Sequence, residues 1–90
     1  MSRAFVNEDA GGSAPRRDYG LPARDDPGYD AAAAGALLEA ARDGETESAE
    51  LATGYYWGEP RLREHVTRIL ARARKAGDER LIQLAERWLR

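Results

Sequence analysis

Apolar residues recur at helical spacing in the last two thirds of the chain, and at no regular spacing before that. The clearest case follows Pro60, where side chains three or four positions apart form one apolar stripe. The stripe consists of Leu62, Val66, Ile69, Leu70 and Ala73. Proline is favoured in the first turn of a helix, and Gly77 can end a helix in the left-handed conformation. This pattern predicts a helix that starts at Pro60 and ends before Gly77, and Asp78 can then cap a last helix.

A first helix is predicted over residues 31–42. Asp30 can cap this helix, because its carboxylate can accept from the free amide groups of the first turn. Alanine, the best helix former, dominates the segment, and Leu37 and Leu38 lie on one side together with Ala34 and Ala41. Gly35 weakens the helix and indicates close packing against a partner helix.

A second, shorter helix is predicted to run to about Thr53. Thr46 or Ser48 can supply its cap, and the residues between Ser48 and Thr53 are mostly good helix formers. Gly54 is placed to stop this helix.

Together these segments predict an all-α fold, a small four-helix bundle over residues 30–90 whose second helix is short. Residues 1–29 are rich in glycine, proline and charge, which is typical of a flexible arm. Within this arm, Phe5, Tyr19 and Leu21 are apolar enough to dock into a groove. The predicted core of the bundle comprises Leu37, Leu38, Leu51, Trp57, Leu62, Val66, Ile69, Leu70, Leu81, Leu84 and Trp88.

Three aromatic residues lie between two glycines in residues 54–60. Exposed aromatic rings of this kind could stack on bases or on another ligand. We favour a packed corner instead, in which Trp57 and one tyrosine fill the junction between helix pairs. Either Tyr55 or Tyr56 then remains on the surface.

The composition excludes several kinds of chemistry. The chain has no cysteine, which excludes disulfides, thiolate metal sites and thiol nucleophiles, and its single histidine, His65, makes a histidine metal cluster implausible. His65 borders the apolar stripe, and no serine or aspartate has the context of a catalytic triad. No apolar run is long enough for a membrane span. We therefore expect a cytoplasmic protein that is not an enzyme and needs no cofactor or metal.

Charge is distributed unevenly along the chain. Residues 1–59 hold five arginines and twelve carboxylates, whereas residues 60–90 hold nine basic residues and four carboxylates. The two parts combine to a net charge of −2. This asymmetry indicates either a charged binding surface or oppositely charged halves that face one another, and we favour the second interpretation.

One candidate binding surface is the basic face predicted for the third helix. Its members, which lie close together at 100° per residue, are Arg61, Arg68, Arg72 and Lys75. Such a face could contact phosphates or a carboxylate-rich protein surface. The acidic pI of about 5.4 and the many carboxylates of the first half favour neutralisation within the protein.

The other candidate surface is the acidic turn between the first two helices. It contains Asp43, Glu45, Glu47 and Glu50. Carboxylates at such a turn could hold a hard cation or enter a basic channel of a partner protein. Acidic residues also favour helix starts and solvated turns for structural reasons alone.

Two segments resemble the Gre-type transcript-cleavage factors, which bind bacterial RNA polymerase. Residues 1–6 and the Glu8-Asp9 pair are similar to the start of some members, and residues 41–50 are similar to the tip of their coiled-coil finger. The resemblance implies that Glu45 and Glu47 are tip acids, which in that family help to hold the catalytic magnesium in the polymerase channel.

The chain also departs from the pattern of that family. The predicted arm over residues 31–42 is only about 18 Å long, and the returning helix stops at Gly54. The second domain of the family is absent, so the resemblance implies docking to the transcription machinery rather than transcript cleavage. Residues 54–62 and 77–81 resemble small bacterial proteins of unassigned function.

The leading hypothesis is a non-enzymatic protein-interaction module that docks on bacterial RNA polymerase. One alternative is nucleic-acid binding through the basic face, and another is a structural protein that associates with itself. The candidate partner-binding residues are Glu45, Glu47, Arg61, Arg68, Arg72, Lys75, Phe5 and Tyr56.

Overall fold

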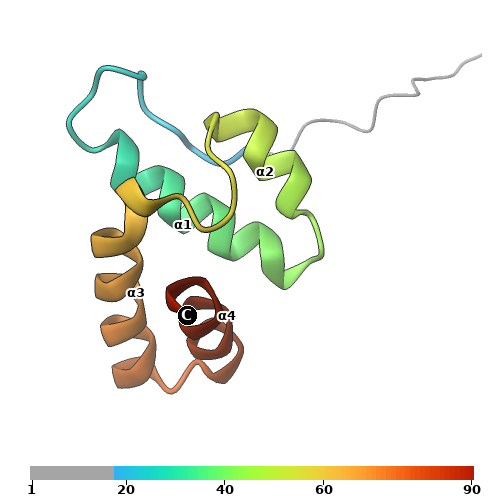
Figure 1. Cartoon of the computed structure of the whole chain (residues 1–90), viewed down its shortest axis with the longest axis vertical. Coiled ribbons are helices and arrows are strands. Elements are labelled where there is room, and N and C mark those ends of the chain that lie inside the picture. Colours follow the sequence, from blue (N-terminus) through green and yellow to red (C-terminus); the bar gives the residue numbers. More distant parts are fainter. Residues whose placement is uncertain (1–17) are drawn as a thin grey trace, which may run out of the picture.

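The computed structural model describes residues 18–90 and shows a small all-α helical bundle (Figure 1). The elements are α1 (Tyr29–Arg42), α2 (Thr46–Thr53), the 3-10 turn η1 (Pro60–Leu62), α3 (Arg63–Ala76) and α4 (Glu79–Leu89). No strand occurs within residues 18–90. The prediction of four helices, of which the second is short, is confirmed.

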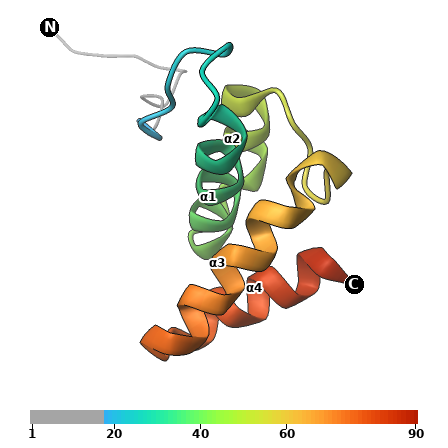
Figure 2. The same cartoon turned by 90° about the vertical axis from the view of Figure 1, so that its left-hand side faces the viewer.

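The helices form two hairpins that pack on one another. Helix α2 returns alongside α1, and α4 returns beneath α3 (Figure 1, Figure 2). Helix α1 also contacts η1, α3 and α4, so it is the element that joins the two hairpins. None of the helices in residues 18–90 has the length and apolar character needed to cross a bilayer.

The core lies between α1 and the α3–α4 hairpin. Alanines on α1 allow close approach of the neighbouring helices, while the larger side chains fill the remaining space. The buried cluster consists of Tyr29, Ala33, Ala34, Leu37, Leu38, Ala40, Ala49, Leu62, Val66, Ile69, Leu70, Leu84, Ala85 and Trp88. Burial of this cluster is the main source of stability for so short a chain.

The first helix starts earlier than the sequence predicts. Helix α1 begins at Tyr29, with Gly28 as the N-cap residue, rather than at residue 31. Tyr29 is buried in the core, and this packing extends the helix by two residues. Asp30 is not the cap, because it lies within the first turn and accepts a hydrogen bond from the Tyr55 hydroxyl at 2.7 Å.

The predicted stop signals are confirmed. Gly54 and Gly77 end α2 and α3 in the left-handed region, with φ of 81° and 70°. Asp78 caps α4, since its Oδ1 accepts from the Leu81 backbone amide at 3.2 Å. Pro60 opens the 3-10 turn η1, and the α-helix itself begins three residues later.

Residues 18–28, which the sequence places in an arm, lie against the helical domain. Tyr19 and Leu21 pack against the core cluster. The Tyr19 hydroxyl donates to Ser48 Oγ at 3.0 Å, so Ser48 holds this segment on α2. The N-cap residue of α2 is Glu45, and neither Thr46 nor Ser48 has that role.

The structure revises part of the predicted core. Leu51 is 82% exposed instead of buried, while Trp57 and Leu81 are only partly buried. Trp57 packs on Trp88 with ring centroids 4.7 Å apart, as the packed-corner interpretation predicts. Gly35 does not mark a close helix contact, because a Cβ atom at this position would meet nothing within 4 Å.

Candidate functional site

The orientation of α2 follows from the few side chains that it buries. Ala49 and Thr53, four residues apart, share one face and are fully buried against the domain. Leu51 lies half a turn away from both and therefore points outward. A helix that is anchored by one small and one polar residue leaves its only leucine in solvent.

A buried hydrogen bond fixes this orientation. The Tyr29 hydroxyl donates to the Thr53 carbonyl oxygen at 2.7 Å. The Tyr55 backbone amide donates to Thr53 Oγ1 at 3.1 Å, and Gly54 turns the chain between them. The end of α2 and the following segment are thereby held together on α1.

Beyond this anchor, α2 and the segment after it form an open cleft of about 340 Å³. We call it the acidic cleft, and its lining residues are Glu47, Glu50, Leu51, Gly54, Tyr55 and Tyr56. Within residues 18–90, the exposed large hydrophobic residues are Leu51 and Tyr56, at 82% and 77% exposure. Both of them line this cleft.

Two carboxylates give the acidic cleft its charge. Glu47 has no hydrogen-bond or ion-pair partner within residues 18–90. Glu50 accepts from the Trp57 backbone amide at 2.8 Å through one oxygen. Carboxylates beside a tyrosine ring and a leucine suit a cationic side chain with an apolar stem, such as arginine.

Contacts between arginine and tyrosine side chains already occur next to the acidic cleft. The Arg24 guanidinium lies 5.4 Å from the centre of the Tyr29 ring and directly beside Gly54. The Arg61 guanidinium lies 6.0 Å from the Tyr55 ring, and its NH1 is 3.4 Å from the Tyr55 hydroxyl. The tyrosines of this region thus hold arginines of the chain itself.

Helix α3 crosses α1 (Figure 2), and residues of both helices line a second depression. We call it the α1–α3 groove, and its volume is about 300 Å³. It is lined by Ala31, Gly35, Leu38, Glu39, Ile69, Arg72, Ala73, Ala76, Asp78 and Leu81. A smaller hollow of about 130 Å³ shares Ala31, Ile69 and Arg72 with it and adds His65 and Arg68 along the α3 edge.

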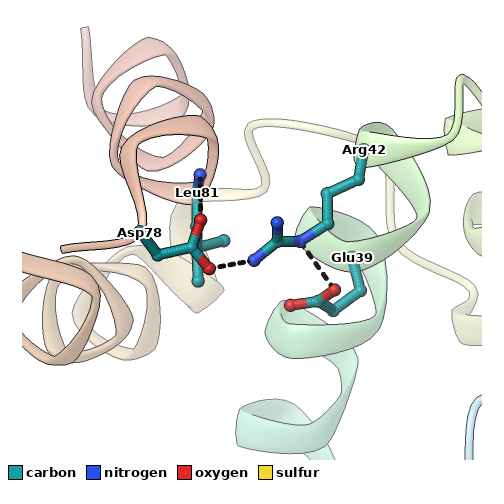
Figure 3. A network of polar contacts seen from close by, with 4 residues as sticks. All are labelled: Glu39, Arg42, Asp78 and Leu81. Carbon is teal, nitrogen blue, oxygen red and sulfur yellow. Dashed lines mark hydrogen bonds and ion pairs between the residues drawn. The ribbon is translucent and has the colours of Figure 1, made fainter. Parts of the chain in front are cut away.

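The carboxylates at one end of the α1–α3 groove are held by Arg42 (Figure 3). Arg42 donates to Asp78, and its Nε lies 2.8 Å from Glu39 Oε1. The hydrogen bond from Arg42, together with that from the Leu81 amide, holds the pKa of Asp78 below its usual value. Arg42 compensates one of these two carboxylates, so this end of the groove stays acidic, while the α3 edge carries the positive charge of Arg72.

The structure brings together some of the predicted partner-binding residues. Glu47 and Tyr56 both line the acidic cleft, whereas Glu45 precedes α2 and does not. Arg68 and Arg72 lie together along the α1–α3 groove. Phe5 lies outside the described residues.

The predicted basic face is not one uniform surface. Arg68 pairs with Glu64, and the pKa of Arg61 is raised by its hydrogen bond with Tyr55. Arg72 and Lys75 are exposed and have no partner within residues 18–90. Arg72 lines the α1–α3 groove and the smaller hollow beside it, whereas Lys75 lines neither of them.

The acidic turn does not assemble a cation site in the described part of the chain. Within residues 18–90, no three histidine or carboxylate side chains are grouped in a way that could hold a metal ion. Glu47 and Glu50 both line the acidic cleft, where one oxygen of Glu50 already accepts from the Trp57 backbone amide.

Sequence reasoning missed Leu51 as a surface residue. The sequence contained a partial signal, because Ala49 and Thr53 are spaced by one helical turn and exclude Leu51 from their face. The pattern does not say which of the two faces is buried. The role of Tyr29 in fixing Thr53 had no signal, because the two residues lie 24 positions apart.

Comparison with protein-family models, with curated proteins and with solved structures finds no match to this chain.

Proposed function

We propose that this chain is a non-enzymatic protein-interaction module. Its acidic cleft binds a segment of another protein that carries arginine or lysine beside apolar side chains. The observation that carries this proposal is the convergence of Leu51 and Tyr56 on a single cleft with two carboxylates. Exposed apolar side chains that gather at one place, with polar residues around them, mark candidate binding sites.

The arrangement supports recognition rather than catalysis. A general base has to be oriented by a hydrogen-bonding partner, and within residues 18–90 His65 has none. The acidic cleft instead combines exposed apolar side chains, two carboxylates and an aromatic ring, a combination that suits a protein-binding site.

Bacterial RNA polymerase is the first macromolecular partner to test. The motivation is the resemblance of residues 41–50 to the finger tip of the Gre-type factors. In the structure, Glu47 of this segment lines the acidic cleft, which supports a contact between the cleft and a basic surface of the polymerase.

The basic face of α3 is the weaker alternative. Within this face Arg68 pairs with Glu64, and Arg74, which lies outside the face on the same helix, pairs with Glu86. These pairs reduce the positive charge that is free to contact phosphates, so we favour a protein partner over nucleic acid.

The chemical preference of the acidic cleft can be tested by NMR titration of the full chain. One synthetic peptide alternates leucine and arginine, and a matched peptide alternates leucine and glutamate. We expect the arginine peptide to shift the resonances of Glu47, Leu51 and Tyr56, and to bind at least about tenfold more tightly than the glutamate peptide.

Matched variants locate the binding. Glu47→Gln and Leu51→Ser are expected to weaken binding of the arginine peptide, while Glu79→Gln, an exposed glutamate on α4, leaves it unchanged. Equal affinity for the two peptides, or shifts confined to α3, would overturn the proposal. Retention of purified bacterial core polymerase by the immobilised chain, and its loss in Leu51→Ser, tests that particular partner.

A further inference from the structure

The acidic cleft and the α1–α3 groove have complementary chemistry. The cleft exposes Leu51 and Tyr56 beside the carboxylate of Glu47, which has no partner within residues 18–90. The groove has an apolar floor that includes Ile69, which keeps 9% exposure, and the partly buried Leu81. Its edge carries the guanidinium of Arg72, for which residues 18–90 supply no ion-pair or hydrogen-bond partner.

The α1–α3 groove also has room for an inserted side chain. Ala31 and Gly35 form its α1 wall, and a Cβ atom on Gly35 would meet nothing within 4 Å. The space above this glycine is therefore open to an apolar side chain from outside. Small wall residues allow the backbones of two partners to approach closely.

The groove has an acidic end and a basic edge, because Arg42 compensates only one of its two carboxylates. Glu39 and Asp78, the carboxylates among its lining residues, are both bound by Arg42 (Figure 3). The α3 edge adds Arg72 and, in the adjoining hollow, His65 and Arg68, of which Arg68 pairs with Glu64. A partner with apolar side chains next to carboxylates is complementary to this edge.

We propose that a second copy of this chain is a partner of the acidic cleft and presents its α1–α3 groove to it. Leu51 and Tyr56 of one copy pack on the apolar floor of the other. Glu47 of the first copy pairs with Arg72 of the second. This inference rests on the proposed function, because it names one partner for the same cleft.

The contact is heterologous, since the two surfaces have no lining residue in common. After two copies meet, one acidic cleft and one α1–α3 groove remain free at the ends of the pair. Such contacts form a ring when the rotation between copies closes, and a growing chain when it does not. The assembly therefore extends beyond a dimer as the protein concentration rises.

Sedimentation velocity of the full chain over a wide concentration range tests the association. Wild type is expected to sediment faster as the concentration increases. Leu51→Arg removes an apolar contact and adds a charge that the groove edge repels, and Arg72→Glu adds a charge that the acidic cleft repels. Both positions are exposed, so the fold tolerates the substitutions. Each variant alone is expected to remain monomeric.

The decisive sample is an equimolar mixture of the two variants. Leu51→Arg keeps an intact groove and Arg72→Glu keeps an intact cleft, so the mixture is expected to restore association and to form at least pairs. A wild type that stays monomeric, a single variant that still associates, or a mixture without pairs would each overturn the inference. If wild type is monomeric but the arginine peptide binds the cleft, this inference fails and the proposed function stands. If wild type is monomeric and the arginine peptide does not bind the cleft, this inference and the proposed function both fail.

Discussion

Helices α1 and α2 lie side by side, yet they use their leucines in opposite ways. Helix α1 buries both of its leucines, Leu37 and Leu38, at 0% exposure. Helix α2 has a single leucine, Leu51, which is 82% exposed. The same side chain therefore stabilises the fold on one helix and is available to a partner on its neighbour.

The difference arises from what holds each helix in place. Helix α1 is surrounded by α2, α3, α4 and η1, so several of its faces are covered. Helix α2 packs on α1 through Ala49 and Thr53, and the bond from Tyr29 to the Thr53 carbonyl fixes its end. Because these contacts suffice to place α2, the position of Leu51 is free for recognition.

The largest expected effect on stability comes from replacing a leucine with alanine, and the same change on α1 and on α2 compares the two helices. Leu37→Ala creates a cavity in the core and is expected to reduce the free energy of unfolding by about 2–5 kcal/mol. Leu51→Ala removes a solvent-exposed side chain and is expected to change it by less than about 0.5 kcal/mol. Urea unfolding at low protein concentration, where self-association is minimal, measures both values.

If Leu37→Ala and Leu51→Ala reduced the free energy of unfolding equally, the comparison between α1 and α2 would be contradicted. Equal reductions would mean that Leu51 is buried in the folded chain. A loss for Leu51→Ala that appears only at high protein concentration would instead support self-association through the acidic cleft, because association stabilises the folded state by mass action.

A smaller effect is expected from the hydroxyl that ties α2 to α1. Tyr29→Phe keeps the buried ring but leaves the Thr53 carbonyl without its donor, which is expected to cost about 1–3 kcal/mol. Tyr56→Phe is the matched control, because Tyr56 is exposed and its loss of a hydroxyl leaves no buried group unpaired. Thermal unfolding followed by circular dichroism compares the stability of the two variants. A Tyr29→Phe variant as stable as wild type would show that α2 is positioned by packing alone.

Local signals in the sequence were sufficient for the helices. Gly54 and Gly77 end α2 and α3 because the left-handed conformation costs glycine little, and Asp78 caps α4 through its own carboxylate. The apolar stripe of α3 predicts Val66, Ile69 and Leu70 as buried residues, and all three are in the core. These features depend on residues within one or two turns of each other.

The binding surfaces depend on contacts between distant parts of the chain, which periodicity does not reveal. The direction of Leu51 follows from the burial of Ala49 and Thr53. The α1–α3 groove places Gly35 near Arg72, residues on helices that cross only in the folded domain. The basic residues of α3 were predicted as a group, but their ion pairs with Glu64 and Glu86 required the structure.

The smallest expected effect concerns the contact between α1 and α4 that Asp78 makes. Its carboxylate caps α4 and also binds Arg42, and both bonds lower its pKa in the folded state. A lowered pKa means that the carboxylate stabilises the fold above the pKa of the unfolded chain, and that this contribution is lost as the pH falls below about 4. Asp78→Asn retains a capping oxygen but loses the charge, whereas Asp78→Ala loses both.

Urea unfolding over a series of acidic pH values separates the two roles of Asp78. We expect Asp78→Ala to be less stable than Asp78→Asn at neutral pH, and Asp78→Asn to lose less stability than wild type on acidification. The differences are expected to be modest, because the side chains of Arg42 and Asp78 are partly exposed and water screens their attraction. If Asp78→Asn and wild type lost stability equally on acidification, the carboxylates responsible would lie elsewhere in the protein. Helix capping would then be the stabilising role left to Asp78. The link between α1 and α4 would differ in this respect from that between α1 and α2, which a neutral buried hydrogen bond provides.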